Sequence, residues 1–225
     1  MKRFLFSICV FCLPVFADDS ALIRQLLAEN LDKRTFSFVD VVRASTGKSV
    51  IPLDPQNPAH QRICTGVRMA LDASMVELSL PNSPVRQLRR INEASRFFED
   101  LLLQKINRTP GLRCEIPRTK SGLEQRSGYP DLKIIDTATG LIAYLDPKLV
   151  ETGSLKSTLR TFYYEPKDTT VKINDDALHL LCGILHDGKE GRWTFQSYHL
   201  VDLSKLRVRL KAEFQASNAD LYSKP

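Results

Sequence analysis

The chain lacks most of the short motifs that reveal an enzyme's chemistry. Its 225 residues contain no glycine-rich phosphate loop and no serine or cysteine nucleophile motif. They also contain no CxxC pair and no cysteine–histidine cluster, so the pattern does not indicate a zinc site. The four histidines are dispersed and include no pair spaced four residues apart. Internal repeats and low-complexity tracts are absent as well. The sequence therefore points to another kind of chemistry.

Long apolar runs are also missing. The run from Phe4 to Phe16 is shorter than the roughly 20 residues that span a bilayer, and no later run is long enough. It follows a basic start and ends near Val15 and Ala17, small enough for positions −3 and −1 of a cleavage site. We expect a signal peptide over residues 1–17, cleaved after Ala17, a secreted or periplasmic location and no stable membrane insertion. An uncleaved anchor and a buried N-terminal strand are the alternatives.

After loss of residues 1–17, the chain would have few cysteines and a modest net charge. Loss of Cys9 and Cys12 with the signal leaves Cys64, Cys114 and Cys182, which allow at most one disulfide and suit buried thiols. The formal charge is +6, of which Lys2 and Arg3 contribute two. A mildly basic chain permits a polyanionic partner without requiring one. Residues 18–225 are long enough for a single domain with a sizeable core.

The clearest helix is predicted from Ser83. Serine is a good N-cap and Pro84 suits the first helical position. Pro110-Gly111 would end the helix. Between them the apolar face is formed by residues spaced three or four apart, namely Val85, Leu88, Ile91, Ser95, Phe98, Leu102 and Ile106.

The other expected elements are mostly short strands. A first helix is expected over Ser20–Leu31, a short strand near residues 36–42 and a proline-marked loop over residues 52–58. Residues 69–80 fit either a strand or a short helix, and a helix is favoured after Lys205 over a strand. Strands are predicted at 112–116, 131–135, 141–150, 159–164, 177–185 and 193–201. This order of elements indicates the α+β class.

Two aspartates in the middle of the chain carry the strongest signal. If residues 137–140 form a four-residue turn, counting outward sets Asp131 opposite Asp146 on neighbouring strands. Lys148 is two residues further and therefore shares their face. Like charges directly opposite one another destabilise a hairpin unless a hard cation lies between them. The alternatives are that Asp131 caps a turn and that Asp146 and Lys148 form a surface ion pair.

The tripeptide Asp/Glu-x-Lys occurs four times, so its context has to select one copy. Only Asp146 ends an apolar run, residues 141–145, that can pair directly with the strand after Asp131. The other copies begin at Asp131, Glu165 and Asp187.

Pro130-Asp131 followed by Asp146-Pro147-Lys148 resembles the PD-(D/E)xK nuclease superfamily. The resemblance covers roughly residues 83–150 and implies a restriction-endonuclease-like fold, a central mixed sheet flanked by helices. It implies that Asp131 and Asp146 bind Mg²⁺ or Mn²⁺ and that Lys148 contacts the attacking water or the scissile phosphate. The sequence departs from the pattern in having Asp for the commoner Glu, and in Pro147, which indicates a strand edge or a bulge.

Many members of that superfamily add an acid from the preceding helix. Glu99 borders the apolar face and is the candidate third metal ligand, with a salt bridge to Arg96 as the alternative. Glu93 points away from that face and is expected to pair with Arg89 in solvent.

These residues together predict a secreted or periplasmic metal-dependent endonuclease, a hydrolase acting on DNA. Basic residues that could hold the DNA backbone are Arg86, Arg89, Arg90, Lys205, Arg207 and Arg209, and Arg160-Thr161-Phe162-Tyr163 could touch a phosphate or a base. The alternative is a non-catalytic secreted binding protein that keeps the nuclease-like fold. The sequence does not define the oligomeric state.

Overall fold

The computed structural model describes residues 19–29, 31–158, 162–211 and 215–222. The predicted signal peptide and its cleavage after Ala17 lie outside these residues and stay a prediction, as does the single domain 18–225. The chain divides into two compact units, a larger one over Ser37–Arg207 and a smaller one that combines Met1–Phe36 with Val208–Pro225.

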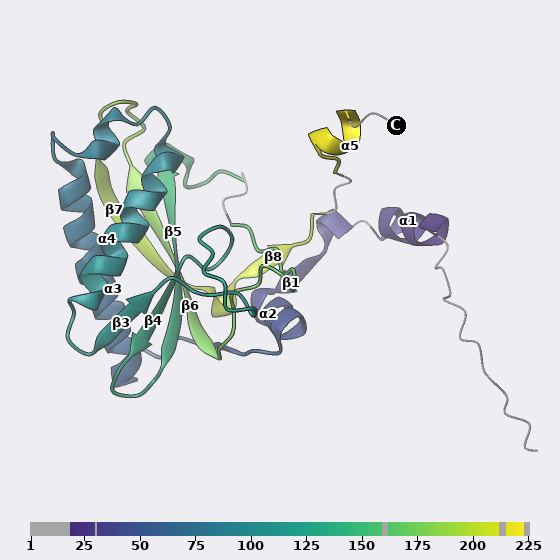
Figure 1. Ribbon diagram of the computed structural model, residues 1–225, viewed down its shortest axis with the longest axis horizontal. Helices are drawn as coiled ribbons and strands as arrows, with labels where there is room; N and C mark the ends of the chain where they lie inside the picture. Colours follow the sequence, from purple (N-terminus) through teal and green to yellow (C-terminus); the bar gives the residue numbers. More distant parts are fainter. Residues whose placement is uncertain (1–18, 30, 159–161, 212–214, 223–225) are drawn as a thin grey trace, which may run out of the picture. The chain divides into compact units, whose positions relative to one another are not determined.

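The larger unit is built on one six-stranded sheet (Figure 1). Its order is β2 (Val50–Ile51), β6 (Ala177–His186), β5 (Ile142–Glu151), β4 (Leu132–Asp136) and β3 (Leu112–Glu115), while β7 (Phe195–Asp202) also pairs with β6. β6 runs parallel to β2 and β5. The pairs β3–β4, β4–β5 and β6–β7 are antiparallel. The predicted mixed sheet is therefore confirmed.

Helices cover both faces of this sheet. Helices α3 (Pro58–Ser79) and α4 (Ser95–Asn107) lie side by side on one face (Figure 1). Their apolar side chains, such as Leu71 and Leu102, share one core with Leu178 and Leu180 of β6. Alternate residues of a strand point to opposite faces. His179 accordingly faces away from this core and contacts Phe38 of α2 (Phe38–Thr46), which lies on the other face. This confirms the predicted α+β, restriction-endonuclease-like fold.

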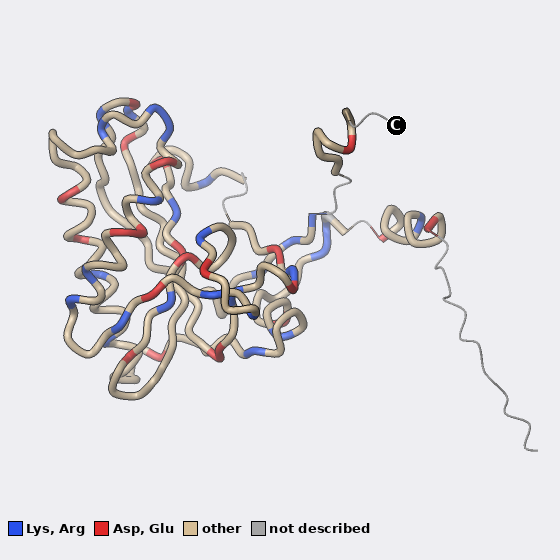
Figure 2. The backbone as a smooth tube through the Cα atoms, viewed as in Figure 1, with Lys and Arg blue, Asp and Glu red and all other residues tan. Residues whose placement is uncertain are grey.

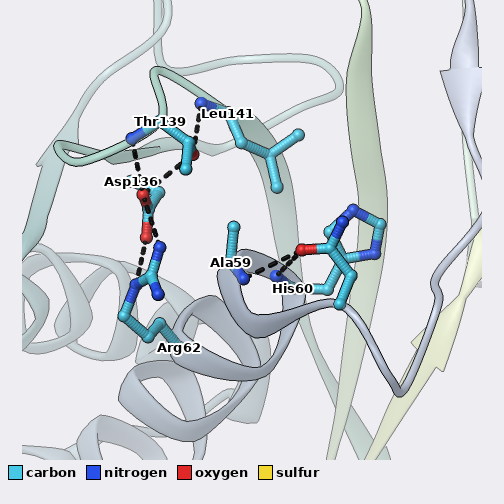
Figure 3. A network of polar contacts seen from close by, with 7 residues as sticks. Ala59, His60, Arg62, Asp136, Thr139 and Leu141 are labelled. Atoms are coloured by element: carbon cyan, nitrogen blue, oxygen red, sulfur yellow. Dashed lines mark hydrogen bonds and ion pairs between the residues drawn. The ribbon is translucent and has the colours of Figure 1, made fainter.

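Helix α3 begins where a loop was expected. Asn57 caps it, because its side-chain oxygen accepts hydrogen bonds from the backbone N–H of Ala59 at 2.9 Å and of His60 at 3.4 Å (Figure 3). Pro58 occupies the first turn, where its missing N–H costs nothing. The proline marked a helix start. Residues 69–79, which fitted either a strand or a helix, form the second half of α3.

The helix predicted from Ser83 is broken into three pieces. Ser83 does cap a helical turn by accepting from the N–H of Val85, but that turn is the short 3₁₀ helix η2 (Pro84–Gln87). A second 3₁₀ turn, η3 (Ile91–Ala94), precedes α4. Leu88 between them is extended, and its carbonyl accepts a hydrogen bond from Trp193 Nε1 at 2.9 Å. A long-range bond has replaced helical continuation there.

Several other expectations meet a mixed outcome. The helix expected over Ser20–Leu31 is α1 (Asp19–Ala28), but the strand expected near residues 36–42 gives way largely to α2. Residues 162–164 form no strand, and residues 159–161 of that prediction lie outside the described part of the chain. The helix favoured after Lys205 is wrong over residues 207–209, where β8 (Arg207–Arg209) pairs with β1 (Thr35–Ser37), and residues 212–214 of that prediction lie outside the described residues. The remaining elements are η1 (Leu31–Lys33), η4 (Thr152–Ser154), η5 (Leu203–Lys205) and α5 (Asn218–Tyr222).

The cysteines agree with a further expectation. Cys64, Cys114 and Cys182 are buried free thiols. None of the described helices combines the length and the apolarity needed to cross a membrane.

Candidate active site

The hairpin of β4 and β5 has the predicted register. Leu132 pairs with Leu145, and the N–H of Asp136 donates to the carbonyl of Leu141 at 2.9 Å. Gly140 closes the turn at a φ of +74°, a left-handed conformation that favours glycine. Continuing this register by one residue sets Asp131 opposite Asp146.

Asp131, Asp146 and Lys148 meet at the open end of this hairpin. Lys148 Nζ lies 2.7 Å from Asp146 Oδ2 and 3.4 Å from Asp131 Oδ2. The exposed fractions of the side chains are 1% for Asp146, 12% for Asp131 and 29% for Lys148. This cluster is therefore a largely buried one, and the alternative of a surface ion pair is wrong.

The middle residue of the motif lies where the sheet has a local edge. Pro147 pairs with Cys182 of β6, but the pairing of β5 with β4 stops at Leu145. The strand is thus open on one side at Pro147, which agrees with the expected edge.

The electrostatics of the cluster favour an additional cation. Burial and the charge of Asp131 raise the pKa of Asp146 to about 8, although Lys148 acts in the opposite direction. Burial opposes protonation of Lys148, but the charges of Asp146 and Asp131 raise its pKa above the ordinary value. Oδ2 of Asp146 is buried and has no hydrogen-bond partner, since its contact with Lys148 is an ion pair without hydrogen-bond geometry.

Glu99 approaches the same cluster from α4. Its side chain is 14% exposed, and burial followed by the charge of Asp131 raises its pKa. Its ion-pair partner is Arg126, at 3.7 Å from Nη1 to Oε2. Arg96, the alternative partner, pairs with Asp100 at 3.3 Å. Glu93 lies exposed in η3, as expected, but it is not in the same helix as Glu99, and the described residues show no ion pair between Glu93 and Arg89.

These residues fit a hard divalent cation as a two-carboxylate site. Such ions take carboxylate and backbone oxygens. Among the described residues, no three Asp, Glu, His or Cys side chains stand close enough together to form a three-ligand group. Asp131 and Asp146 already converge on one positive charge, that of Lys148, and a cation bound at Oδ2 of Asp146 would compete with it. Glu99 does not complete a three-ligand group with them.

Sequence reasoning missed two residues near the cluster. Lys172 is buried and donates from Nζ to the carbonyl of Gln125 at 3.0 Å. Tyr129, which directly precedes Pro130, is buried, and its hydroxyl lies 2.7 Å from Nδ1 of His179. Its position beside the Pro-Asp pair was a usable signal, whereas nothing in the local sequence marks Lys172.

The remaining polar candidates have varied positions. Phe162 packs on Phe38 and Tyr129, with ring centroids 5.6 and 5.2 Å apart, and so belongs to an aromatic core. Arg160 and Thr161 lie outside the described residues. Arg86 donates to the carbonyl of Ser79 at 3.3 Å and has a buried Nε. Arg89 and Arg90 are exposed. In the view of Figure 2, both signs of charge are scattered over the larger unit.

A mixed sheet flanked by helices, with an acid–lysine cluster on one of its hairpins, defines a protein of the restriction-endonuclease-like class. Residues 29–225 match the model of the type II restriction enzyme MjaV family, and the chain belongs to that family. It is also 27% identical over 220 residues to the type II restriction enzyme MjaV of Methanocaldococcus jannaschii, and the match covers 93% of each chain. Family membership makes this chain a DNA endonuclease, a hydrolase, and the alternative of a non-catalytic binding protein is not supported.

Proposed function

We propose that this chain hydrolyses phosphodiester bonds of DNA as a PD-(D/E)xK nuclease, at the cluster of Asp131, Asp146 and Lys148. The observation that carries the proposal is the convergence of both carboxylates on Nζ of Lys148, at 3.4 and 2.7 Å. Membership of a type II restriction enzyme family supports DNA as the substrate.

Asp131 and Asp146 would hold the divalent cation, Mg²⁺ or Mn²⁺, with Glu99 as an outer partner. Such an ion, when bound, polarises the scissile phosphate and stabilises charge on the leaving oxygen. Lys148 would then exchange its ion pair with Asp146 for a contact with the attacking water or a phosphate oxygen. In that position its ammonium offsets the negative charge that develops in the transition state.

The DNA backbone needs cationic contacts outside this cluster. Arg89 and Arg90 are exposed in the larger unit and suit this role. Arg86 suits it less, because its guanidinium is engaged with Ser79. Lys205, Arg207 and Arg209 remain candidates on charge alone.

Export of the chain is a separate proposal that rests on residues 1–17. The family match begins at residue 29 and so does not include them. Mass spectrometry of the protein expressed with its full N-terminus would test it. A mature chain that begins at Asp18 would support cleavage after Ala17, and a chain that retains residues 1–17 would contradict it.

The nuclease proposal is tested by incubating the purified protein with plasmid DNA, with and without Mg²⁺ or Mn²⁺. We expect metal-dependent cleavage that is lost in Asp131→Asn, Asp146→Asn and Lys148→Met. The matched control is Glu165-Pro166-Lys167, another copy of the Asp/Glu-x-Lys pattern, in which the side chains of Glu165 and Lys167 are 72% and 62% exposed. Glu165→Gln and Lys167→Met should cut like the parent. Cleavage that needs no metal, or that survives Asp146→Asn, contradicts the proposal.

A further inference from the structure

Lys172 is a buried cation that the cluster of Asp131, Asp146 and Lys148 does not explain. Lys172 is 0% exposed, and its neighbours in the sequence, Val171 and Ile173, are buried as well. Its ammonium donates to the carbonyl of Gln125, and among the described residues no carboxylate pairs with it directly. A lysine is almost never fully buried without a charged partner, because removing the ammonium from water costs several kcal/mol.

The charges that act on Lys172 are those of the candidate site. Burial lowers the pKa of Lys172 to about 8, while the charges of Asp131, Asp146 and Glu99 act to raise it. The ammonium therefore lies within electrostatic reach of all three acids, although it does not contact them. The charge of Lys148 acts in the opposite sense and lowers the pKa of Lys172.

The partner of Lys172 belongs to the segment that delivers Asp131. We call residues 125–131 the strap. It starts at Gln125, and the next side chain, Arg126, reaches Glu99 at 3.7 Å and Asp100 at 2.7 Å. The strap ends at Asp131, which meets Lys148. Lys172 thus fixes one end of the strap. The rest of the strap carries Arg126, which pairs with Glu99 of α4, and Asp131, which pairs with Lys148 of the hairpin.

Asn174 attaches the segment around Lys172 to two other parts of the chain. Nδ2 of Asn174 donates to the carbonyl of Arg118 at 2.7 Å, and the N–H of Asn174 donates to the hydroxyl of Tyr144 at 3.0 Å. The segment around Lys172 is therefore held in place without the ammonium. An apolar side chain of similar length at position 172 would leave this attachment intact.

We propose that Lys172 is a positioning residue of the nuclease site, a buried counter-charge to Glu99, Asp131 and Asp146 that sets how tightly they bind a divalent cation. The inference rests on the proposed function of these acids. A fixed positive charge near a cation site repels the incoming ion, and the repulsion is strong where water is excluded. The same charge offsets the mutual repulsion of the acids when no cation is bound.

The test is a calorimetric titration of the whole protein with Mn²⁺ and with Ca²⁺ in the absence of DNA. Lys172→Met removes the charge and the hydrogen bond, Lys172→Gln removes the charge but keeps a donor, and Lys172→Arg keeps both. We expect Met and Gln to tighten cation binding by about fivefold or more, the lower range of a coupling between sites. Arg should bind like the parent. The melting temperature of the Gln variant should not fall, because it removes the buried charge and keeps a donor for the carbonyl of Gln125.

Lys105→Met is the matched control. Lys105 is a half-buried lysine of α4 whose ammonium pairs with Glu77 at 2.7 Å, so its loss should leave cation affinity unchanged. Unchanged or weaker binding in Lys172→Gln overturns the inference about Lys172, even if Lys172→Met fails to fold. The proposed function is tested separately by Asp146→Asn: if it binds the cations as tightly as the parent, the assignment of the site fails, and the inference fails with it.

Discussion

Lys148 holds its ammonium 2.7 Å from Oδ2 of Asp146, a buried oxygen that has no hydrogen-bond partner. The two residues lie on the same face of β5, two positions apart, so strand geometry alone brings them together. The carboxylate depends on this one ammonium for its compensation within the hairpin. A cation that binds this oxygen must therefore compete with Lys148 for it.

The first prediction concerns the charge of Asp146. Its pKa is raised above the ordinary carboxyl value, which means that the fold disfavours the ionised form and is destabilised by it at neutral pH. Asp146→Asn removes that charge at nearly constant volume. Cleavage should fall by about 10²–10³-fold or more, while the melting temperature stays level or rises. Plasmid cleavage and thermal unfolding measure the two quantities. A variant that cleaves normally, or that melts several degrees lower, contradicts this account.

The second prediction separates two glutamates that are close in sequence. Glu99→Gln should lower the apparent affinity for Mg²⁺ in the cleavage reaction by about 10–100-fold. This is the usual effect of losing an outer partner of a metal site. Glu93→Gln, at an exposed position, should have no effect. Cleavage rates over a range of Mg²⁺ concentrations give the affinities. Equal behaviour of the two variants would remove Glu99 from the site.

The residues found by sequence reasoning are those whose placement depends on local geometry. One turn, residues 137–140, fixes the register of the hairpin, and the register carries Asp131, Asp146 and Lys148 to one face. The position of Glu99 followed from counting along a helix. Lys172 could not be found in this way, because its bond to Gln125 joins residues 47 positions apart.

Distant contacts also explain some of the wrong predictions about the fold. The break at Leu88 depends on a hydrogen bond from Trp193, 105 residues away, which no local pattern encodes. The start of α3 is different, because Asn57-Pro58 is a local signal of an N-cap followed by the first helical turn. The run of prolines at 52, 55 and 58 predicts a loop, whereas Pro58 in fact begins the helix. Residues 38–42 form a helix although their apolar and aromatic side chains suit a strand, since packing on the sheet overrides propensity.

The third prediction concerns the hydrogen bond between His179 and Tyr129, which lies two residues before Asp131 in the sequence. The hydroxyl of Tyr129 lies 2.7 Å from Nδ1 of His179, and burial lowers the pKa of His179 to about 3, so this ring is neutral. Nε2 of His179 has no hydrogen-bond partner among the described residues. Tyr129→Phe would leave both ring nitrogens unpaired and should destabilise the fold by about 1–3 kcal/mol. Denaturant unfolding measures this. Tyr222→Phe, at a 78% exposed position, is the control that should change nothing.

The fourth prediction concerns Asp136, at the turn end of the hairpin. Its carboxylate accepts from Nε and Nη2 of Arg62 at 2.7 and 3.0 Å, and from the N–H and hydroxyl of Thr139 at 2.9 and 2.8 Å (Figure 3). Asp136 is 0% exposed. The hydrogen bonds from Arg62 are the largest cause that lowers its pKa to about 2. The pair therefore ties α3 to the hairpin that carries the site.

The sign of the pH dependence follows from this lowered pKa. The unfolded chain binds a proton at Asp136 near pH 4, whereas the folded chain resists protonation until about pH 2. The stabilisation is thus fully present above pH 4 and is lost as the pH falls from 4 to 2. We expect a contribution of about 1–2 kcal/mol, below the full linkage value because solvent reaches Arg62. Asp136→Asn should flatten the curve of unfolding free energy against pH in this window. An unchanged slope between pH 4 and 2 would show that Asp136 does not titrate with folding.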